Sequence, residues 1–149
     1  ARVMAVKGRS MFKHILVPMD LSGGHQRALR VALALAVAYR ARVTLLHVIQ
    51  QVADTEVSEL RDFYRRLVQT SERKLDRAAR PFARRGVPLS TEVRIGEPAA
   101  EILKAGARRP AGLIVMASHG LKPRRPAGGW GTTSYKVGLL CRCPILLVK

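Results

Sequence analysis

The sequence predicts a single α/β domain in which helices cover both faces of a parallel five-stranded sheet. Short apolar runs of strand length alternate along the chain with longer stretches of helical periodicity, in the order βαβαβαβαβ. This alternation is typical of parallel strands joined by right-handed crossovers, the open Rossmann-like architecture. The 149 residues, 48% of them hydrophobic, are enough for one buried core and exclude an intrinsically disordered chain.

The composition of the expected strands predicts where each one lies in the sheet. Four of them are nearly continuous apolar runs, as expected for strands covered on both faces, whereas residues 89–95 alternate apolar with polar side chains. The third strand is therefore expected at an edge, and the predicted order is 3-2-1-4-5 with two helices on each face. The expected strands are residues 14–19, 42–48, 89–95, 112–117 and 144–149.

Start and stop signals mark the helices. Ser22 is a good N-cap for the first helix, Asp54 or Thr55 for the second, and Pro98 suits the first turn of the third. Pro81 is expected to kink or end the second helix because proline lacks the backbone N–H that a helix interior uses. The expected helices are residues 23–40, about 56–85, 98–108 and about 131–141.

The charge is strongly unbalanced, with 27 Lys and Arg against 10 Asp and Glu, a net charge of +17. Such a surface attracts polyanions in general, whether nucleotides, nucleic acids or acidic lipid headgroups. Aromatic residues make up only 5% of the chain, so stacking platforms for single-stranded nucleic acid are scarce. The second helix begins with acidic and ends with basic residues, which suits the helix dipole and is more typical of a solvated face than of a nucleic-acid groove.

The sequence also predicts the domain limits and the compartment. Residues 1–10 are expected to be an extension or a cloning remnant that the domain at 11–149 does not need, and they are too weakly apolar for a secretory signal. The longest uncharged apolar run, residues 31–39, is about half of a membrane span, so no membrane association is expected. Cys141 and Cys143 are expected to be buried free thiols in a reducing cytoplasm, because two ligands cannot close a zinc site.

Ligands of open parallel sheets bind beyond the carboxyl ends of the strands, where the strand order reverses. Asp20 is the only carboxylate at the end of the first strand, within reach of a ribose hydroxyl or a base amine, and is equally expected as a turn residue. His47, inside an apolar strand, is more typical of a hydrogen-bonded core residue than of a ligand. His119 lies beside Gly120 in the loop after the fourth strand, but a lone histidine supports no catalytic assignment.

The stretch 117–133 is dense in glycine, proline and hydroxyl residues between two apolar runs. It contains no Walker P-loop, and no Gly-x-Gly-x-x-Gly follows the first strand. Gly131, Thr132, Thr133 and Ser134 open a helix, where backbone N–H groups and hydroxyls would suit phosphates. The same composition is also typical of an ordinary surface turn.

From Met11 to Lys149 the chain resembles the universal stress protein family. The segments FKHILVPMDLS, VTLLHV and RIGEPAAEIL resemble its first strand, its second strand and the start of its third helix. The family's nucleotide motif is a glycine, two residues, a second glycine, nine residues, then glycine and Ser or Thr. Here Ala117 takes the place of the first glycine, and ten residues separate Gly120 from Gly131.

The resemblance implies an adenine nucleotide alpha hydrolase-like fold that binds ATP, with or without Mg²⁺. It implies that Asp20 and the backbone of Val48 hold the adenosine, and that glycines and threonines of the motif hold the ribose and phosphates. It further implies a homodimer through the edge strand at 144–148, whose apolar composition independently invites pairing. The complete candidate site comprises Pro18, Asp20, Val48, Ala117, His119, Gly120, Gly131, Thr132 and Thr133.

Three functions follow from these observations. The leading one is a cytoplasmic, ATP-binding stress-response protein that acts as a binder or switch and is at most a slow ATPase, since no general base is apparent beyond Asp20 or His119. The second is a dimeric stress protein that binds no nucleotide and acts through protein contacts. The third, a nucleic-acid-associated protein, rests on the net charge alone.

Overall fold

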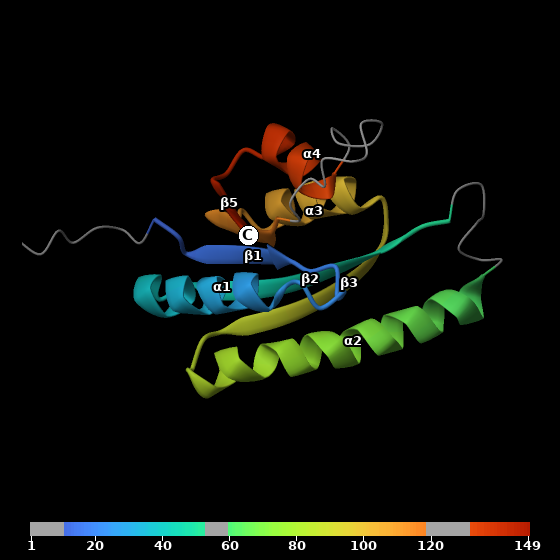
Figure 1. Ribbon diagram of the computed structural model, residues 1–149, viewed down its shortest axis with the longest axis horizontal. Helices are drawn as coiled ribbons and strands as arrows, with labels where there is room; N and C mark the ends of the chain where they lie inside the picture. The colour runs from blue at the N-terminus through green and yellow to red at the C-terminus, as the bar shows by residue number, and fades with distance from the viewer. Residues whose placement is uncertain (1–10, 53–59, 119–131) are drawn as a thin grey trace, which may run out of the picture.

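The computed structural model describes residues 11–52, 60–118 and 132–149, and within these ranges the elements follow the predicted order (Figure 1). The strands are β1 (His14–Pro18), β2 (Arg42–Gln50), β3 (Leu89–Gly96), β4 (Leu113–Ala117) and β5 (Ile145–Val148). The helices are α1 (Gln26–Tyr39), α2 (Arg61–Arg84), α3 (Pro98–Arg108) and α4 (Thr133–Leu140).

The five strands form one parallel sheet in the order β3-β2-β1-β4-β5, as predicted. In the register of the central strands, Ile15 of β1 lies beside Val43 of β2 on one side and Leu113 of β4 on the other. The alternating strand β3 forms one edge and the apolar strand β5 the other. The strand order reverses between β1 and β4, which defines where a ligand site is expected.

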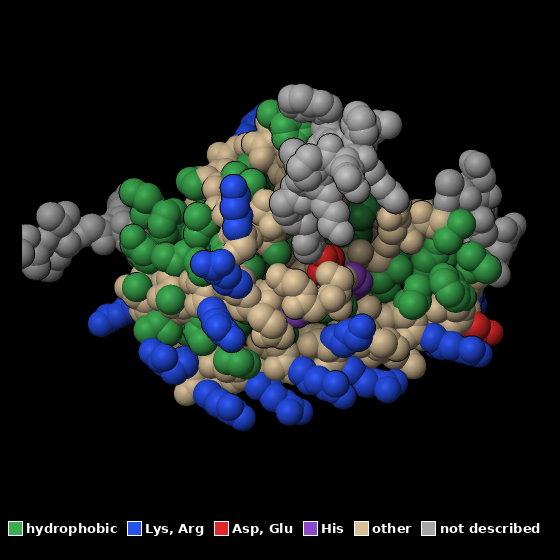
Figure 2. Space-filling view, viewed as in Figure 1, with side chains coloured by type: hydrophobic (Ala, Val, Ile, Leu, Met, Phe, Trp, Pro, Cys, Tyr) green, Lys and Arg blue, Asp and Glu red, His purple; other side chains and the backbone are tan. Residues whose placement is uncertain are grey.

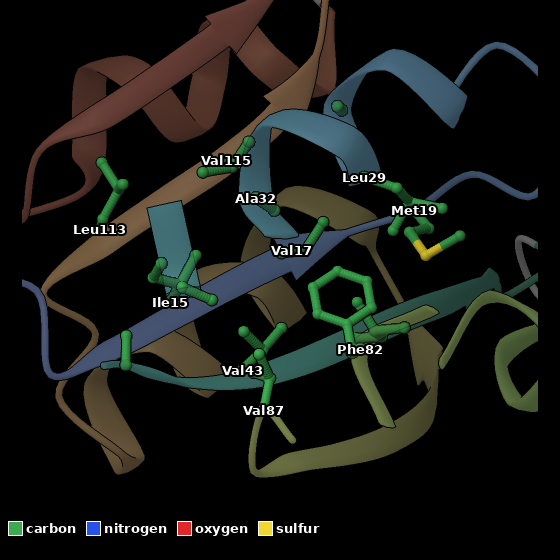
Figure 3. Close-up of a cluster of buried hydrophobic side chains, with 14 of the residues drawn as sticks. Ile15, Val17, Met19, Leu29, Ala32, Val43, Phe82, Val87, Leu113 and Val115 are labelled. Carbon is green, nitrogen blue, oxygen red and sulfur yellow. The ribbon is translucent and has the colours of Figure 1, made fainter. Parts of the chain in front are cut away.

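The core has two layers, one on each face of the sheet. Figure 3 shows Ile15 and Val17 of β1 converging with Leu29 and Ala32 of α1 and with Phe82 of α2. On the opposite face, neighbouring residues of β1 and β4 pack against α3 and α4. Consecutive strand residues therefore point into different cores, which explains why the central strands are continuous apolar runs. The second cluster includes Leu16, Leu46, Ala99, Ile102, Ile114, Met116 and Val137.

The start of the first helix corrects the sequence prediction. Ser22 does not cap it: α1 begins at Gln26, and its N-cap, His25, makes no side-chain capping bond. The reason lies in the turn before it, where Leu21 (φ 61°) and Gly23 (φ 96°) adopt left-handed backbone conformations that a right-handed helix cannot contain. The chain therefore needs three more residues before the helix starts.

The other helix signals had mixed outcomes. Pro98 lies in the first turn of α3, as predicted. The predicted start of the second helix is wrong: α2 begins at Arg61 with Leu60 as its N-cap, and Asp54 and Thr55 lie outside the described residues. Pro81 does not end α2, which continues to Arg84. Because Pro81 lies in the last turn of α2, its missing N–H removes a single i→i−4 bond and the helix needs only three more residues to reach its end.

Cys141 and Cys143 are free thiols, as predicted, but both are half-buried and not fully buried, because they lie in the turn that leads to the edge strand. The predicted extension at residues 1–10 lies outside the described residues. No helix in the described ranges combines the length and the apolar character that crossing a membrane requires.

Candidate functional site

A cavity of about 320 Å³ opens at the carboxyl ends of β1, β2 and β4, where the strand order reverses. Its size lies within the range of small-molecule sites. Five elements contribute to its wall: the turn after β1, the end of β2, the first turns of α3, the end of β4 and the start of α4. The lining residues are Pro18, Met19, Asp20, His25, Leu46, His47, Val48, Gln50, Pro98, Ile102, Met116, Ala117, Thr132, Thr133 and Ser134.

The structure places six of the nine predicted site residues around this one cavity. Pro18 and Asp20 come from the end of β1, Val48 from β2 and Ala117 from β4, and the two threonines come from the start of α4. These residues are up to 115 positions apart in the sequence, from Pro18 to Thr133. The remaining three, His119, Gly120 and Gly131, lie outside the described residues.

Backbone and histidine hydrogen bonds fix the turn that carries Asp20. Met19 donates its backbone N–H to the carbonyl of Leu46 at 2.8 Å, and Nδ1 of His47 donates to the carbonyl of Met19 at 2.7 Å. His47 is thus the hydrogen-bonded residue that the sequence predicted. By tying the turn to β2, it holds the position of the next residue, Asp20, at the mouth of the cavity.

Asp20 is both a turn residue and part of the cavity. Its Oδ1 accepts a hydrogen bond from the backbone N–H of Ser22 at 2.9 Å, the pattern of an Asx turn. The next residue, Leu21, has the left-handed φ of 61°, an uncommon conformation for a non-glycine residue. The Asp20 side chain remains 46% exposed, so a carboxylate stays available to a ligand.

His25 is a site residue that the sequence analysis missed. Its Nδ1 is buried, makes no hydrogen bond to any described residue, and lies 4.0 Å from Oδ1 of Asp20. Burial lowers the pKa of His25 and nearby Lys74 lowers it further, although Asp20 acts in the opposite direction. The imidazole is therefore neutral near pH 7, and a ligand hydroxyl or amine could supply the partner that a buried polar atom ordinarily has. The only sequence signal was a histidine directly after the glycines of the turn.

The start of α4 brings hydroxyls and backbone N–H groups to the opposite wall. Thr132 is the N-cap, and its Oγ1 accepts a hydrogen bond from the N–H of Tyr135 at 3.3 Å. Thr133 and Ser134 form the first turn and also line the cavity. The first N–H groups of a helix lack intrahelical partners and carry the positive end of its dipole, so this wall favours an anionic group.

An ion pair ties α4 to α3. Glu97 caps α3 by accepting a hydrogen bond from the N–H of Ala100 at 2.7 Å, which is the main cause of its lowered pKa. Nζ of Lys136 on α4 lies 3.7 Å from Oε1 of the same carboxylate. Both helix starts are thereby held beside the cavity, whose α3 wall is Pro98 and Ile102. The sequence analysis identified Pro98 but missed the capping role of Glu97.

The arrangement suits a ligand with a flat apolar part and an anionic end. Leu46, Ile102 and Met116 form apolar walls, while Asp20 and the start of α4 provide polar groups at the rim. Asp20 is the only carboxylate among the described lining residues, and the described part of the chain contains no cluster of three or more potential metal ligands. A cation at this site would therefore have to be held largely by the ligand itself, as Mg²⁺ commonly is by phosphates.

Two curated relatives match the chain over most of its length. A universal stress protein of Bacillus subtilis, YxiE, is 32% identical, and the match covers 93% of this chain and 100% of the relative. A universal stress protein of Thermus aquaticus is 36% identical over the same shares of the two chains.

Solved structures share the fold. A protein from the universal stress protein family from Burkholderia pseudomallei is 28% identical, with a TM-score of 0.72 over 95% of this chain and 98% of that one. A universal stress protein in complex with cAMP is 19% identical, with a TM-score of 0.69 over 92% and 96% of the two chains. The protein from Archaeoglobus fulgidus in complex with dAMP is 18% identical, with a TM-score of 0.69 over 93% and 99%.

The parallel sheet, its strand order and the placement of helices on both faces are those of the adenine nucleotide alpha hydrolase-like fold of these proteins. The family model for universal stress proteins matches residues 11–149, all of the chain that follows the first ten residues. With the two relatives above 30% identity, this match shows that the chain belongs to the universal stress protein family.

Proposed function

We propose that this universal stress protein binds ATP in the cavity at the carboxyl ends of β1, β2 and β4, and that it acts in the cytoplasm as a nucleotide-dependent stress-response protein. One observation carries the proposal: the same cavity joins a carboxylate at Asp20, the buried Nδ1 of His25, which has no hydrogen-bond partner among the described residues, and the N-terminus of α4. Two structures of the same fold, the complexes with cAMP and dAMP, contain adenine nucleotides.

Each part of the nucleotide has a partner of matching chemistry. The adenine would lie among Leu46, Ile102 and Met116, with the backbone of Val48 beside its polar edge. The ribose hydroxyls would donate to Asp20. The phosphates would lie at the start of α4, near Thr132 and Thr133, where they meet backbone N–H groups. Any Mg²⁺ would bind to the phosphates, because the part of the lining that the structure describes offers only one carboxylate.

The proposed role is that of a binder or switch, with hydrolysis slow at most. Fast phosphoryl transfer needs a positioned nucleophile and strong charge stabilisation around the γ-phosphate. Among the described lining residues, Lys and Arg are absent, and His47 already donates Nδ1 to a backbone carbonyl. The site therefore offers recognition groups for the nucleoside and few groups for catalysis.

Calorimetry with ATP and adenosine tests the proposed nucleoside contacts and the proposed phosphate contacts separately. Asp20→Asn keeps the acceptor oxygen for Ser22 but removes the charge from the ribose contact, so both ligands should bind about tenfold more weakly. Thr133→Glu adds a negative charge that suits the helix dipole yet repels phosphate, so ATP should lose at least about tenfold in affinity while adenosine changes little. Adenosine is thus the matched control for the second variant.

Mass spectrometry of the small molecules released on denaturing the purified protein gives a direct second readout. An adenine nucleotide in stoichiometric amount is the expected result. If neither released nucleotide nor calorimetric ATP binding is found, the second candidate function, a stress protein that works without nucleotide, replaces this one. Equal ATP affinity in the wild type and in both variants would instead place the nucleotide elsewhere.

The proposal also includes a homodimer through β5. Four leucines in the last part of the chain are exposed: Leu146 (38%) and Leu147 (42%) on the strand, and Leu139 (67%) and Leu140 (65%) at the end of the preceding helix, α4. Large apolar side chains gathered at an unpaired strand edge favour association with a second chain. An antiparallel pairing of two β5 strands about a two-fold axis would cover them and leave no edge for further growth.

A further inference from the structure

A second hollow lies on the face of the sheet that α1 and α2 cover. It is a groove between these helices, of about 500 Å³, lined by described residues from the turn after β1, from α1 and from α2. It is separate from the nucleotide cavity, although His25 contributes to the walls of both. Its volume is in the range that holds an organic ligand.

The floor of the groove is apolar. Leu29 of α1 and Phe82 of α2 are almost completely buried, and Leu33 and Ala78 are half-buried above them. The lining runs along α1 from Gln26 to Leu33, which corresponds to about 10 Å at the rise of an α-helix. The groove therefore offers an elongated apolar surface between two helices.

The rim of the groove is cationic. Arg30 of α1 and Lys74 and Arg77 of α2 line it, all three exposed, and none forms an ion pair with a described residue. No Asp or Glu is found among the described residues that line the groove. Figure 2 shows Lys and Arg side chains gathered along the part of the surface that α2 occupies in Figure 1. Three cations around an apolar floor, with no carboxylate among them, are complementary to a ligand with one anionic end and an apolar body.

We propose that the groove between α1 and α2 binds a medium-chain fatty-acid carboxylate, with its alkyl chain on Leu29, Leu33 and Phe82 and its carboxylate at Arg30, Lys74 and Arg77. A nucleic acid fits less well, because its backbone would face an apolar floor and the only aromatic ring of the lining, Phe82, is buried. A bilayer surface fits less well too, because the apolar side chains lie at the bottom of the groove between two helices and do not protrude. This site does not depend on nucleotide binding.

Titration of the ¹⁵N-labelled full chain with decanoate tests the proposal, and butyrate and decanol serve as ligand controls. Decanoate should shift amide signals of α1 and α2 around the groove. Butyrate, which lacks most of the chain, and decanol, which lacks the charge, should each bind more than tenfold more weakly. ATP should not displace decanoate.

Two charge-reversal variants of one helix separate the groove from the general surface charge. Lys74→Glu with Arg77→Glu removes two rim cations and should weaken decanoate binding by at least tenfold. Arg73→Glu with Arg80→Glu changes the net charge by the same amount at exposed positions outside the lining, and should leave the affinity within about twofold. Thermal melting of both variants confirms that each is folded.

Four results would overturn the proposal. These are no shift with decanoate, an equal loss in the two variants, binding only to anionic vesicles and not to free decanoate, or displacement by ATP with shifts confined to the ends of β1, β2 and β4. The last result would place the fatty acid in the nucleotide cavity. Shifts around the groove that the rim variant alone abolishes would establish the site.

Discussion

The two edges of the sheet meet the solvent in opposite ways. On β3, polar side chains alternate with apolar ones, and Glu92 and Arg94 form ion pairs with each other and with α3. On β5, Leu146 and Leu147 are 38% and 42% exposed. A free strand edge can pair with another chain unless charges or a covering element prevent it. Ion pairs within the chain thus hold the polar side chains of β3, whereas apolar side chains of β5 are exposed to solvent, as the proposed dimer requires.

The protection of β3 is a network around one arginine. Nε of Arg94 donates to Oε1 of Glu92 at 2.7 Å, and its Nη1 lies 3.4 Å from Oε2 of Glu101. Arg108 and Lys104 of α3 extend the network to the same two carboxylates, at 3.2 Å and 2.7 Å. The Arg94 side chain is only 14% exposed, so it is held across the polar face of β3 and not free in solvent. Lys104, first, and then Arg94 lower the pKa of Glu101.

The largest expected effect comes from breaking the β5 edge. The carbonyls of Pro144 and Val148 accept bonds from β4, so by the alternation of a parallel ladder the N–H groups of Ile145 and Leu147 point to the free edge. Leu147→Pro removes one of these donors and should convert a dimer into the 16.4 kDa monomer in light scattering at low micromolar concentration. A proline at Leu146 would instead disrupt the bond to β4 within one chain.

Leu147→Thr is the matched control for this prediction, because threonine is a good strand former and keeps the backbone N–H. It should remain largely dimeric. A wild-type protein that is already monomeric would remove the proposed contrast between the edges. A dimer that survives Leu147→Pro would place the interface on another surface, and the four exposed leucines would then need a different explanation.

The strand pattern predicted the β3 edge, but it did not mark β5, whose run is as apolar as that of an interior strand and whose edge position followed only from the predicted strand order. The alternation in residues 89–95 placed β3 at one edge, and the continuous apolar runs placed β1, β2 and β4 inside. It did not predict the network of β3, because Glu101 and Arg108 reach Glu92 and Arg94 only after α3 has packed on the sheet. Such contacts depend on the three-dimensional arrangement and have no fixed spacing in the sequence.

The second effect comes from removing Arg94. Arg94→Met keeps an apolar stem of similar length but leaves Glu92 and Glu101, whose side chains are 30% and 16% exposed, without their shared partner. The expected loss is about 2 kcal/mol in the free energy of unfolding, as for half-buried charged hydrogen bonds. Urea denaturation at a fixed protein concentration measures it, because dimerisation would also change the apparent stability.

Arg84→Met is the control for the arginine deletion. Arg84 is exposed near the end of α2 and forms no ion pair with a described residue, so its loss should change the free energy of unfolding by less than about 0.5 kcal/mol. Equal effects of the two substitutions would mean that the β3 network contributes nothing beyond ordinary surface charge. The comparison between the edges would then rest on side-chain polarity alone.

The sequence likewise predicted only part of the cavity. The rule that ligands bind at the carboxyl ends of parallel strands located Asp20, the hydroxyls at a predicted helix start indicated Thr132 and Thr133, and the resemblance added Val48. His25 was missed because the expected helix began before it, at residue 23, whereas left-handed residues in the turn delay the helix to Gln26. The left-handed turn therefore places His25 before the helix, on the wall of the cavity, whereas the prediction had it in the first helical turn.

The smallest expected effect concerns a buried histidine whose hydrogen bonds reach the amino-terminal end of β3. His14 of β1 is 7% exposed, and its Nε2 lies 2.8 Å from Oγ1 of Thr44 on β2, which in turn lies 3.1 Å from Oγ of Ser90 on β3. Its Nδ1 lies 3.3 Å from the carbonyl of Arg109, and since a carbonyl only accepts, Nδ1 carries the proton. With a neutral imidazole, Nε2 accepts from the Thr44 hydroxyl, and the chain of bonds connects the β3 edge with the centre of the sheet.

Stability should therefore fall as the pH is lowered through the histidine range. Burial lowers the pKa of His14 below its usual 6.5; the hydrogen bond to the carbonyl of Arg109 opposes this shift, while the positive charges of Arg109 and Arg42 add to it. Below pH 6.5 the unfolded chain binds the proton first, so the contribution of neutral His14, complete above that pH, declines until the folded pKa is reached. One proton gives a slope of at most about 1.4 kcal/mol per pH unit.

Urea denaturation between about pH 5 and 8, above the usual range of carboxylates, should show a flatter dependence for His14→Gln than for the wild type. His25 has a lowered pKa as well, so His25→Gln measures its separate share. An unchanged slope in His14→Gln, with the whole dependence removed in His25→Gln, would assign the effect to the cavity and leave the β3 edge insensitive to pH.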